Sequence, residues 1–208
     1  MKYLSTLFLF CTLFFVGCAT NTNLERSQEP LRSYPVFMTD GQQSAVFKAE
    51  ALAGNYKANF ILMLNAADEG EKQIKILGDY AAVLMKATFK DGAFTYQYLP
   101  QDLFDKVALS VFEDTLKNLL AEPKDFKKYK VKQDNTLISF KSGNFLNTYY
   151  FKQGDKYPYQ MKQSKGLINK DFYFDDYRLF NGKQVPYRIL VSEAKGRAAI
   201  ELTLLSLK

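Results

Sequence analysis

The stretch QDLFDKVALSVFEDTLKNLLAEP, residues 101–123, is the longest segment of the chain with a clear helical period. Most of its charged residues lie away from one continuous apolar stripe. That stripe consists of Leu103, Phe104, Val107, Ala108, Val111, Phe112, Leu116, Leu119 and Leu120. The spacing predicts an amphipathic helix of about five turns, and Pro123 is expected to stop it.

Segments with a period of two surround this helix on both sides. Apolar residues alternate with polar ones in four segments before it: residues 54–65, 71–77, 78–89 and 91–98. After it, residues 126–165 are expected to hold three or four strands, followed by strands over 167–180, 184–194 and 197–207. Clusters of Asp, Asn and Gly separate these segments, which is typical of hairpin turns.

We therefore expect about ten or eleven strands in an antiparallel meander, with the helix inserted near its middle. A sheet of this size curls because its strands twist. The concave face must be covered, and the striped helix is the segment suited to cover it. The predicted fold is mainly β with one long helix: an antiparallel half-barrel covered by a helical lid, over residues 34–208.

Composition restricts the chemistry of the chain. There is no histidine and no tryptophan, and there are only two cysteines. These absences exclude Ser-His-Asp and Cys-His catalytic sites and a His-ligated zinc site. The neighbouring carboxylates Glu113–Asp114 and Asp175–Asp176 diverge on a helix or strand, so each pair is interpreted as a solvated or ion-paired patch. We predict no enzyme activity, no metal and no cofactor.

The amino terminus has the pattern of a secretory leader. Lys2 is the only charged residue before residue 25, and residues 3–17 are nearly all apolar or small. This apolar run is shorter than the ~20 residues that a transmembrane helix needs. Residues 1–17 are therefore predicted to be a signal peptide. The polar, aperiodic residues 18–33 are predicted to be a tether between the membrane and the domain.

The leader ends in Phe15-Val16-Gly17-Cys18, which resembles the lipobox of bacterial lipoproteins. The resemblance implies cleavage between Gly17 and Cys18 and a diacylglycerol on the Cys18 sulfur. Two or more acyl chains anchor a protein stably to a membrane. Ala19 stands where lipoproteins retained at the inner membrane carry Asp, which favours the outer membrane. The alternative is a plain secreted protein in which Cys18 is a free thiol.

The chain after residue 17 carries a small positive excess. Without Lys2 it has 27 basic against 22 acidic side chains. This excess is interpreted as dispersed along the chain and solvated, with weak attraction to anionic lipid headgroups. Nucleic acid is not expected as a partner, because the leader directs the chain out of the cytoplasm.

Aromatic and aliphatic side chains recur at alternate positions in the predicted strands and on the helix. They are candidates to line a groove for an apolar ligand between sheet and helix. The alternative is that they pack against the helix and one another. The candidates are Phe60, Leu62, Phe94, Tyr96, Phe112, Leu116, Phe172 and Phe174.

Three stretches together resemble the LolA/LolB lipoprotein-carrier superfamily: IKILGDYAAVLMKATFKDGAFTYQY (74–98), the helix after it, and residues 172–208. With the lipobox, the likeness is closer to the outer-membrane acceptor LolB. It implies an incomplete antiparallel barrel with a helical lid over a hydrophobic cavity. In LolB an exposed leucine on a strand-connecting loop helps to pass lipoproteins into the membrane. Leu77, before Gly78, is the matching position.

These observations support two hypotheses of different classes. The first is an outer-membrane-anchored, periplasm-facing lipoprotein that binds or hands over acyl chains of lipids or lipoproteins in its half-barrel groove. The second is a non-enzymatic structural or interaction subunit of a cell-envelope assembly, in which the same core is filled by side chains.

Overall fold

The computed structural model describes residues 32–39, 42–100, 106–180, 182–193 and 195–208. Residues from Leu31 to Lys208 form one compact unit. The predictions for Gly17 and Cys18 lie outside the described residues, as do Leu103 and Phe104 of the predicted helix. No helix among the described residues is both long enough and apolar enough to cross a membrane.

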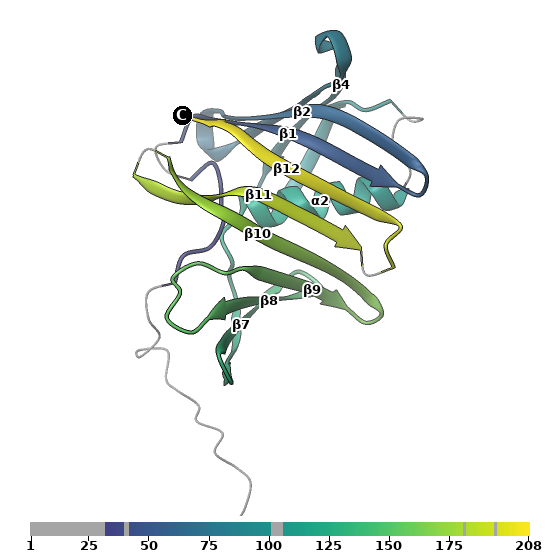
Figure 1. The fold of residues 1–208 in the computed structure, drawn as a ribbon. Helices are drawn as coiled ribbons and strands as arrows, with labels where there is room; N and C mark the ends of the chain where they lie inside the picture. Colours follow the sequence, from purple (N-terminus) through teal and green to yellow (C-terminus); the bar gives the residue numbers. More distant parts are fainter. Residues whose placement is uncertain (1–31, 40–41, 101–105, 181, 194) are drawn as a thin grey trace, which may run out of the picture. The chain divides into compact units, whose positions relative to one another are not determined.

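The described residues form one sheet of 12 antiparallel strands in the order β5-β4-β3-β2-β1-β12-β11-β10-β9-β8-β7-β6 (Figure 1). The strands are β1 (Ser44–Ala53), β2 (Tyr56–Ala66), β3 (Lys72–Leu77), β4 (Val83–Lys90), β5 (Ala93–Tyr98), β6 (Phe126–Lys132), β7 (Asn135–Ser142), β8 (Phe145–Lys152), β9 (Gln160–Lys165), β10 (Ile168–Phe180), β11 (Lys183–Glu193) and β12 (Ala198–Leu207). All neighbours follow one another in the chain except β1 and β12, which pair in the middle of the sheet.

This order leaves β5 and β6 at the two edges of the sheet. The segment that connects them contains α2 (Lys106–Leu120), so the helix lies on the path from one edge to the other. It packs against β12, β11 and β1, and Figure 1 shows it behind these central strands. The predicted mainly-β fold with one helix and an antiparallel meander is confirmed, and the sheet is open rather than closed.

The predicted number of strands, about ten or eleven, is wrong, because the expected strands did not include β1. The predicted strand over residues 78–89 is also too long. Its first part is a short 3₁₀ turn, η3 (Asp79–Ala81), in which Tyr80 and Ala81 have φ of 55° and 58°. Gly78 permits the turn to fold back onto β4, since a Cβ there would lie 2.8 Å from Leu84 Cδ1.

The helix buries the stripe that its sequence predicts. Val111, Phe112, Leu116, Leu119 and Leu120 are all buried, and the helix ends before Pro123. Its core contacts include a T-shaped pair between Phe112 and Phe60, with ring centroids 6.4 Å apart.

The segment before β1 covers the carboxyl end of α2. The Phe37 backbone N–H donates to the Leu119 carbonyl at 2.7 Å, and the Phe37 ring packs on Phe47 at a centroid distance of 5.1 Å. Arg32 and Ser33 contact β8 and the residues after it. The Ser33 N–H donates to the Lys156 carbonyl, and the Arg32 guanidinium lies 4.9 Å from the Phe151 ring centroid.

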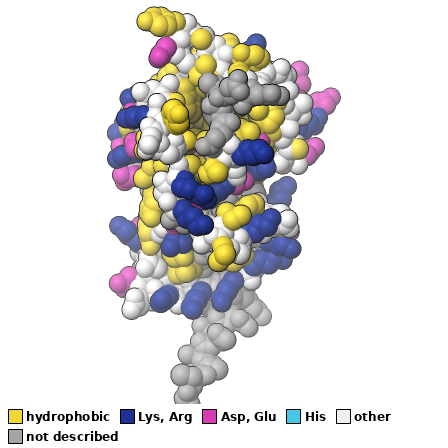
Figure 2. Space-filling view, turned by 90° about the vertical axis from the view of Figure 1, so that its right-hand side faces the viewer, with side chains coloured by type: hydrophobic (Ala, Val, Ile, Leu, Met, Phe, Trp, Pro, Cys, Tyr) yellow, Lys and Arg dark blue, Asp and Glu magenta, His cyan; other side chains and the backbone are white. Residues whose placement is uncertain are grey.

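The interpretation that basic residues are dispersed along the chain is wrong. Of the 27 basic and 22 acidic side chains after residue 17, ten and three lie within residues 124–165, which leaves 17 and 19 elsewhere. All ten lysines of this segment are exposed. Strands β6 to β9 therefore carry the positive excess of the chain, and Figure 2 shows Lys and Arg side chains gathered over the lower half of the viewed face.

Candidate functional site

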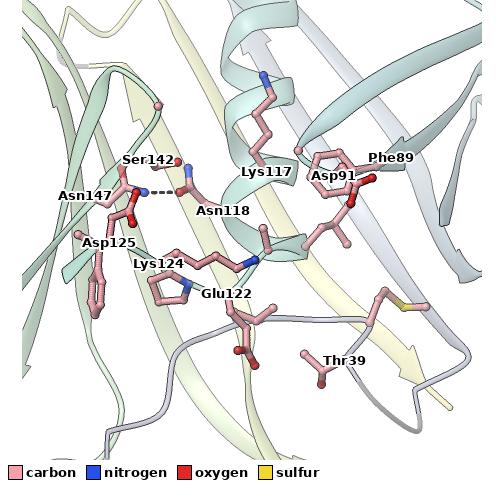
Figure 3. Close-up of a pocket in the computed structure, with 18 of the residues that line it drawn as sticks. Thr39, Phe89, Asp91, Lys117, Asn118, Glu122, Lys124, Asp125, Ser142 and Asn147 are labelled. Atoms are coloured by element: carbon pink, nitrogen blue, oxygen red, sulfur yellow. Dashed lines mark hydrogen bonds between the residues drawn. The ribbon is translucent and has the colours of Figure 1, made fainter. Parts of the chain in front are cut away.

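A cavity of about 850 Å³ lies at the carboxyl end of α2 (Figure 3). Its walls come from both ends of the strand order. Phe89 and Asp91 belong to β4 and the turn after it, whereas Phe140 and Tyr149 belong to β7 and β8. Since β4 and β7 are far apart in the sheet, it must curve until both of its ends face the same space.

The floor of the cavity is apolar and its rim is charged. Its buried lining consists mainly of the apolar residues Val36, Met38, Phe89, Leu120, Phe140 and Tyr149, together with the amides of Asn118 and Asn147. Five lysines and three acids line the rim: Lys72, Lys90, Lys117, Lys124, Lys141, Asp91, Glu122 and Asp125. An apolar interior with a few polar groups at its margin is typical of a small-molecule site. The arrangement suits an amphiphile whose chain is buried and whose headgroup stays near water.

Two lysines hold the helix end and the segment before β1 in place. Lys72 Nζ donates to the Leu120 carbonyl at the end of α2. Lys183 Nζ donates to the Val36 carbonyl at 3.1 Å and to Thr39 Oγ1 at 2.8 Å. Burial lowers the pKa of both lysines, and nearby Glu122 partly opposes that shift. The Lys72 hydrogen bond satisfies one of the carbonyl groups that a helix leaves without an intrahelical partner at its carboxyl end.

A row of polar helix residues, Ser110, Asp114 and Asn118, faces β8, β9 and β10. Asp114 and Asn118 are buried, whereas Ser110 is exposed. Lys170 Nζ pairs with Asp114 Oδ2 and donates to Ser110 Oγ at 3.1 Å. Asn147 donates to Asn118 Oδ1 at 2.6 Å (Figure 3). Gln163 Nε2 in turn donates to Asn147 Oδ1 at 3.2 Å, while Gln163 Oε1 has no hydrogen-bond partner among the described residues.

This polar row was not predicted from the sequence. Asp114 was expected on a solvated or ion-paired patch; it is ion-paired, but only 8% of its surface is exposed. The signal was the spacing of Ser110, Asp114 and Asn118, which places three polar residues on one helix row. A second signal was Lys170, which shares a strand face with Phe172 and is therefore directed inward.

The predicted lining residues lie mostly between α2 and the sheet. Six are buried, with at most 6% of their surface exposed: Phe60, Leu62, Phe112, Leu116, Phe172 and Phe174. Phe94 and Tyr96 are half-buried on β5, and Tyr96 Oη donates to Glu113 Oε1 at 2.5 Å. None of the eight lines the cavity at the helix end.

Leu77 is the last residue of β3 and is half-buried. The fully exposed side chain of the β3–β4 connection is Tyr80, three residues further on. No group of three or more Cys, Asp or Glu residues placed to hold a metal ion occurs in the described ranges.

Buried tyrosines predict loss of stability in alkali. Burial raises the pKa of Tyr149 and Tyr177, and burial together with the Glu113 carboxylate raises that of Tyr96. In the unfolded chain these phenols ionise near pH 10, whereas in the folded state they keep their protons. The folded state then binds more protons, so its stability falls as pH rises above about 10.

Absorbance of phenolate against pH, with circular dichroism in parallel, checks this expectation. We expect three of the 13 tyrosines after residue 17 to ionise only as the fold is lost. Ionisation of all 13 near pH 10 with an intact near-ultraviolet spectrum would contradict it.

In the part of the chain that the structure describes, one α-helix lies on a face of an open antiparallel sheet, and this is a LolA-like fold. A LolA superfamily protein from Nitrosomonas europaea superposes with a TM-score of 0.52 and 12% identity, over 86% of this chain and 88% of that one. A DUF1329 family protein from Desulfovibrio piger gives a TM-score of 0.54 and 11% identity, over 81% and 86%.

A putative outer membrane lipoprotein-sorting protein domain from Vibrio parahaemolyticus gives a TM-score of 0.48 and 8% identity, over 80% of this chain and 85% of that one. No family model and no curated protein sequence matches the chain. At these identities the likeness is one of fold.

Proposed function

We propose that this protein is a non-enzymatic, outer-membrane-anchored lipoprotein that binds acyl chains of lipids or lipoproteins and hands them over. The observation that carries the proposal is the cavity at the end of α2. It has a buried apolar floor and a charged rim, and it lies in a LolA-like fold.

Binding would be hydrophobic, without covalent chemistry. An acyl chain that leaves water for the floor gains ~0.8 kcal/mol for each buried methylene. The headgroup would remain at the rim, where the Lys124 side chain extends into the cavity (Figure 3). The sheet then acts as a half-barrel and α2 as its lid. Release of residues 36–39, held by Lys183 and by the Phe37–Leu119 hydrogen bond, would widen the entrance.

The eight side chains that the sequence predicts to line a groove would contact a ligand in an open state of the protein. They would meet a ligand once α2 moves away from β1, β11 and β12. In the described structure these side chains are packed between α2 and the sheet, so the groove is closed there.

Location follows from the amino terminus. In this proposal residues 1–17 are removed as a signal peptide, Cys18 is lipidated, and residues 18–33 tether the domain on the periplasmic side of the outer membrane. A LolB-like transfer role for the β3–β4 connection would rest on Tyr80 rather than on Leu77, because Tyr80 is the side chain that protrudes there.

Native mass spectrometry of a chain that begins at residue 19 tests the proposal. We expect the purified protein to carry lipid or fatty acid in this cavity. Delipidated protein should take up added fatty acid. A protein that is lipid-free as purified and takes up no fatty acid would contradict the proposal.

The second candidate is a structural or interaction subunit of an envelope assembly. The dense packing between α2 and the sheet favours it, since six predicted lining residues are already buried against other side chains. Recovery of a stoichiometric protein partner with lipid-free protein would support this candidate over the first.

A further inference from the structure

The net positive charge of the chain is concentrated at one end of the sheet. Strands β6 to β9 and their turns, residues 124–165, hold ten exposed lysines and three aspartates; this segment is called the basic wall. Within the described residues, only Lys162 of these lysines is in an ion pair, at 3.7 Å from Asp171. The rest of the chain after residue 17 has a small negative excess. Charge this concentrated and this weakly neutralised produces a local field that attracts anions.

The edge strand β6 carries the densest part of the basic wall. Lys128, Lys130 and Lys132 alternate with Tyr129, which packs against the core, so the three lysines share the outer face. Lysines on an edge strand also prevent edge-to-edge pairing between molecules. Protection of an edge strand needs only a few charged side chains, of either sign. It does not explain the lysines of β8 and β9, because these are internal strands.

Exposed apolar side chains accompany the lysines. Leu167 and Ile168, at the turn after β9, are 93% and 50% exposed, and Leu146 on β8 is 40% exposed. Lysines beside protruding apolar side chains are typical of surfaces that lie on anionic membranes, where the cations meet phosphate and the apolar tips enter the headgroup layer. Binding to a purely acidic protein partner would not involve these exposed apolar side chains.

We infer that the basic wall binds the surface of a bilayer that contains anionic phospholipids. Lys124 and Lys141 belong both to the wall and to the cavity rim, so membrane contact through the wall brings the cavity mouth next to the lipid headgroups. The inference concerns a different surface from the cavity floor and stands or falls independently of acyl-chain binding.

Vesicle co-sedimentation tests the inference. Residues 31–208 form a compact unit with its own core, so a chain that begins at residue 19 keeps the wall and lacks any lipid anchor. We expect it to bind vesicles of phosphatidylcholine with phosphatidylglycerol, and not phosphatidylcholine alone. Added salt should weaken this binding.

The variant K128E/K130E/K132E keeps the edge strand charged but reverses its sign. Because each lysine near an anionic surface strengthens binding about fivefold, we expect a loss of about a hundredfold or more. The matched control, K86E/K106E/K195E, changes net charge equally at exposed lysines outside the wall and should lose much less.

Three results would overturn the inference: no binding to the phosphatidylglycerol vesicles, equal binding to phosphatidylcholine alone, or equal loss in both variants. If poly-glutamate binds through β6 while vesicles do not, the wall serves an acidic polypeptide instead. None of these results affects lipid co-purification, which depends on the cavity.

Discussion

Replacing Lys170 with methionine is expected to lower the free energy of unfolding by about 3–5 kcal/mol, because the change leaves Asp114 as an unpaired buried carboxylate. Only 4% of Lys170 and 8% of Asp114 is exposed, and the lysine also donates to both oxygens of Ser110. Urea denaturation followed by circular dichroism measures the effect.

Two further variants separate charge pairing from packing. The double variant Lys170→Met/Asp114→Leu removes both charges and should recover most of the loss, since apolar side chains of similar size can replace a buried ion pair. Lys162→Met, at a half-exposed ion pair on β9, should cost less than about 1 kcal/mol. A Lys170→Met protein as stable as the parent would contradict the buried pair.

Filling the cavity is expected to abolish most fatty-acid binding. Ala121 and Ser142 are exposed residues that line the cavity, from just after α2 and from the last position of β7. Tryptophan at both positions would occupy the space of an acyl chain. Excluding only two methylenes, at ~0.8 kcal/mol each, weakens binding about tenfold. Competition against a fluorescent fatty acid measures the affinity.

The control for this experiment is Ala58→Trp/Ala82→Trp, which adds two exposed rings on β2 and in the β3–β4 connection. It should bind fatty acid as the parent does. Denaturation curves establish that both double variants are folded. Unchanged affinity in a folded Ala121→Trp/Ser142→Trp protein would remove the cavity as the binding site.

Much of the architecture could be predicted from local pattern. The stripe from Val107 to Leu120 gave the helix and its buried face, and alternation with Gly- and Asn-containing turns gave most strands. These signals act between residues close in sequence, where side-chain direction follows from backbone period alone. The η3 turn was missed because Tyr80, Ala81 and Ala82 continue the small and apolar pattern of the strand.

The position of the cavity could not be predicted, and the spacing of the polar helix row did not show its partners, because both depend on contacts distant in sequence. Asp114 and Lys170 are 56 residues apart, and Asn118 and Asn147 are 29 apart. Period analysis separates apolar from polar faces and assigns polar residues to solvent. It cannot show that strands distant in sequence, such as β8 with Asn147, lie against α2. The excess of lysine in residues 124–165 can be counted in the sequence. That these lysines lie on neighbouring strands follows only from the order of strands in the sheet.

Photo-crosslinking of a fatty acid with a diazirine near its methyl end tests the central claim most directly. The reagent is added to the delipidated chain from residue 19, and mass spectrometry maps the modified peptides. We predict modification within residues 117–125 and 140–149 and at Phe89, which surround the cavity floor. Modification confined to the outer face of the sheet, or no saturable modification, would contradict the claim that this cavity binds acyl chains.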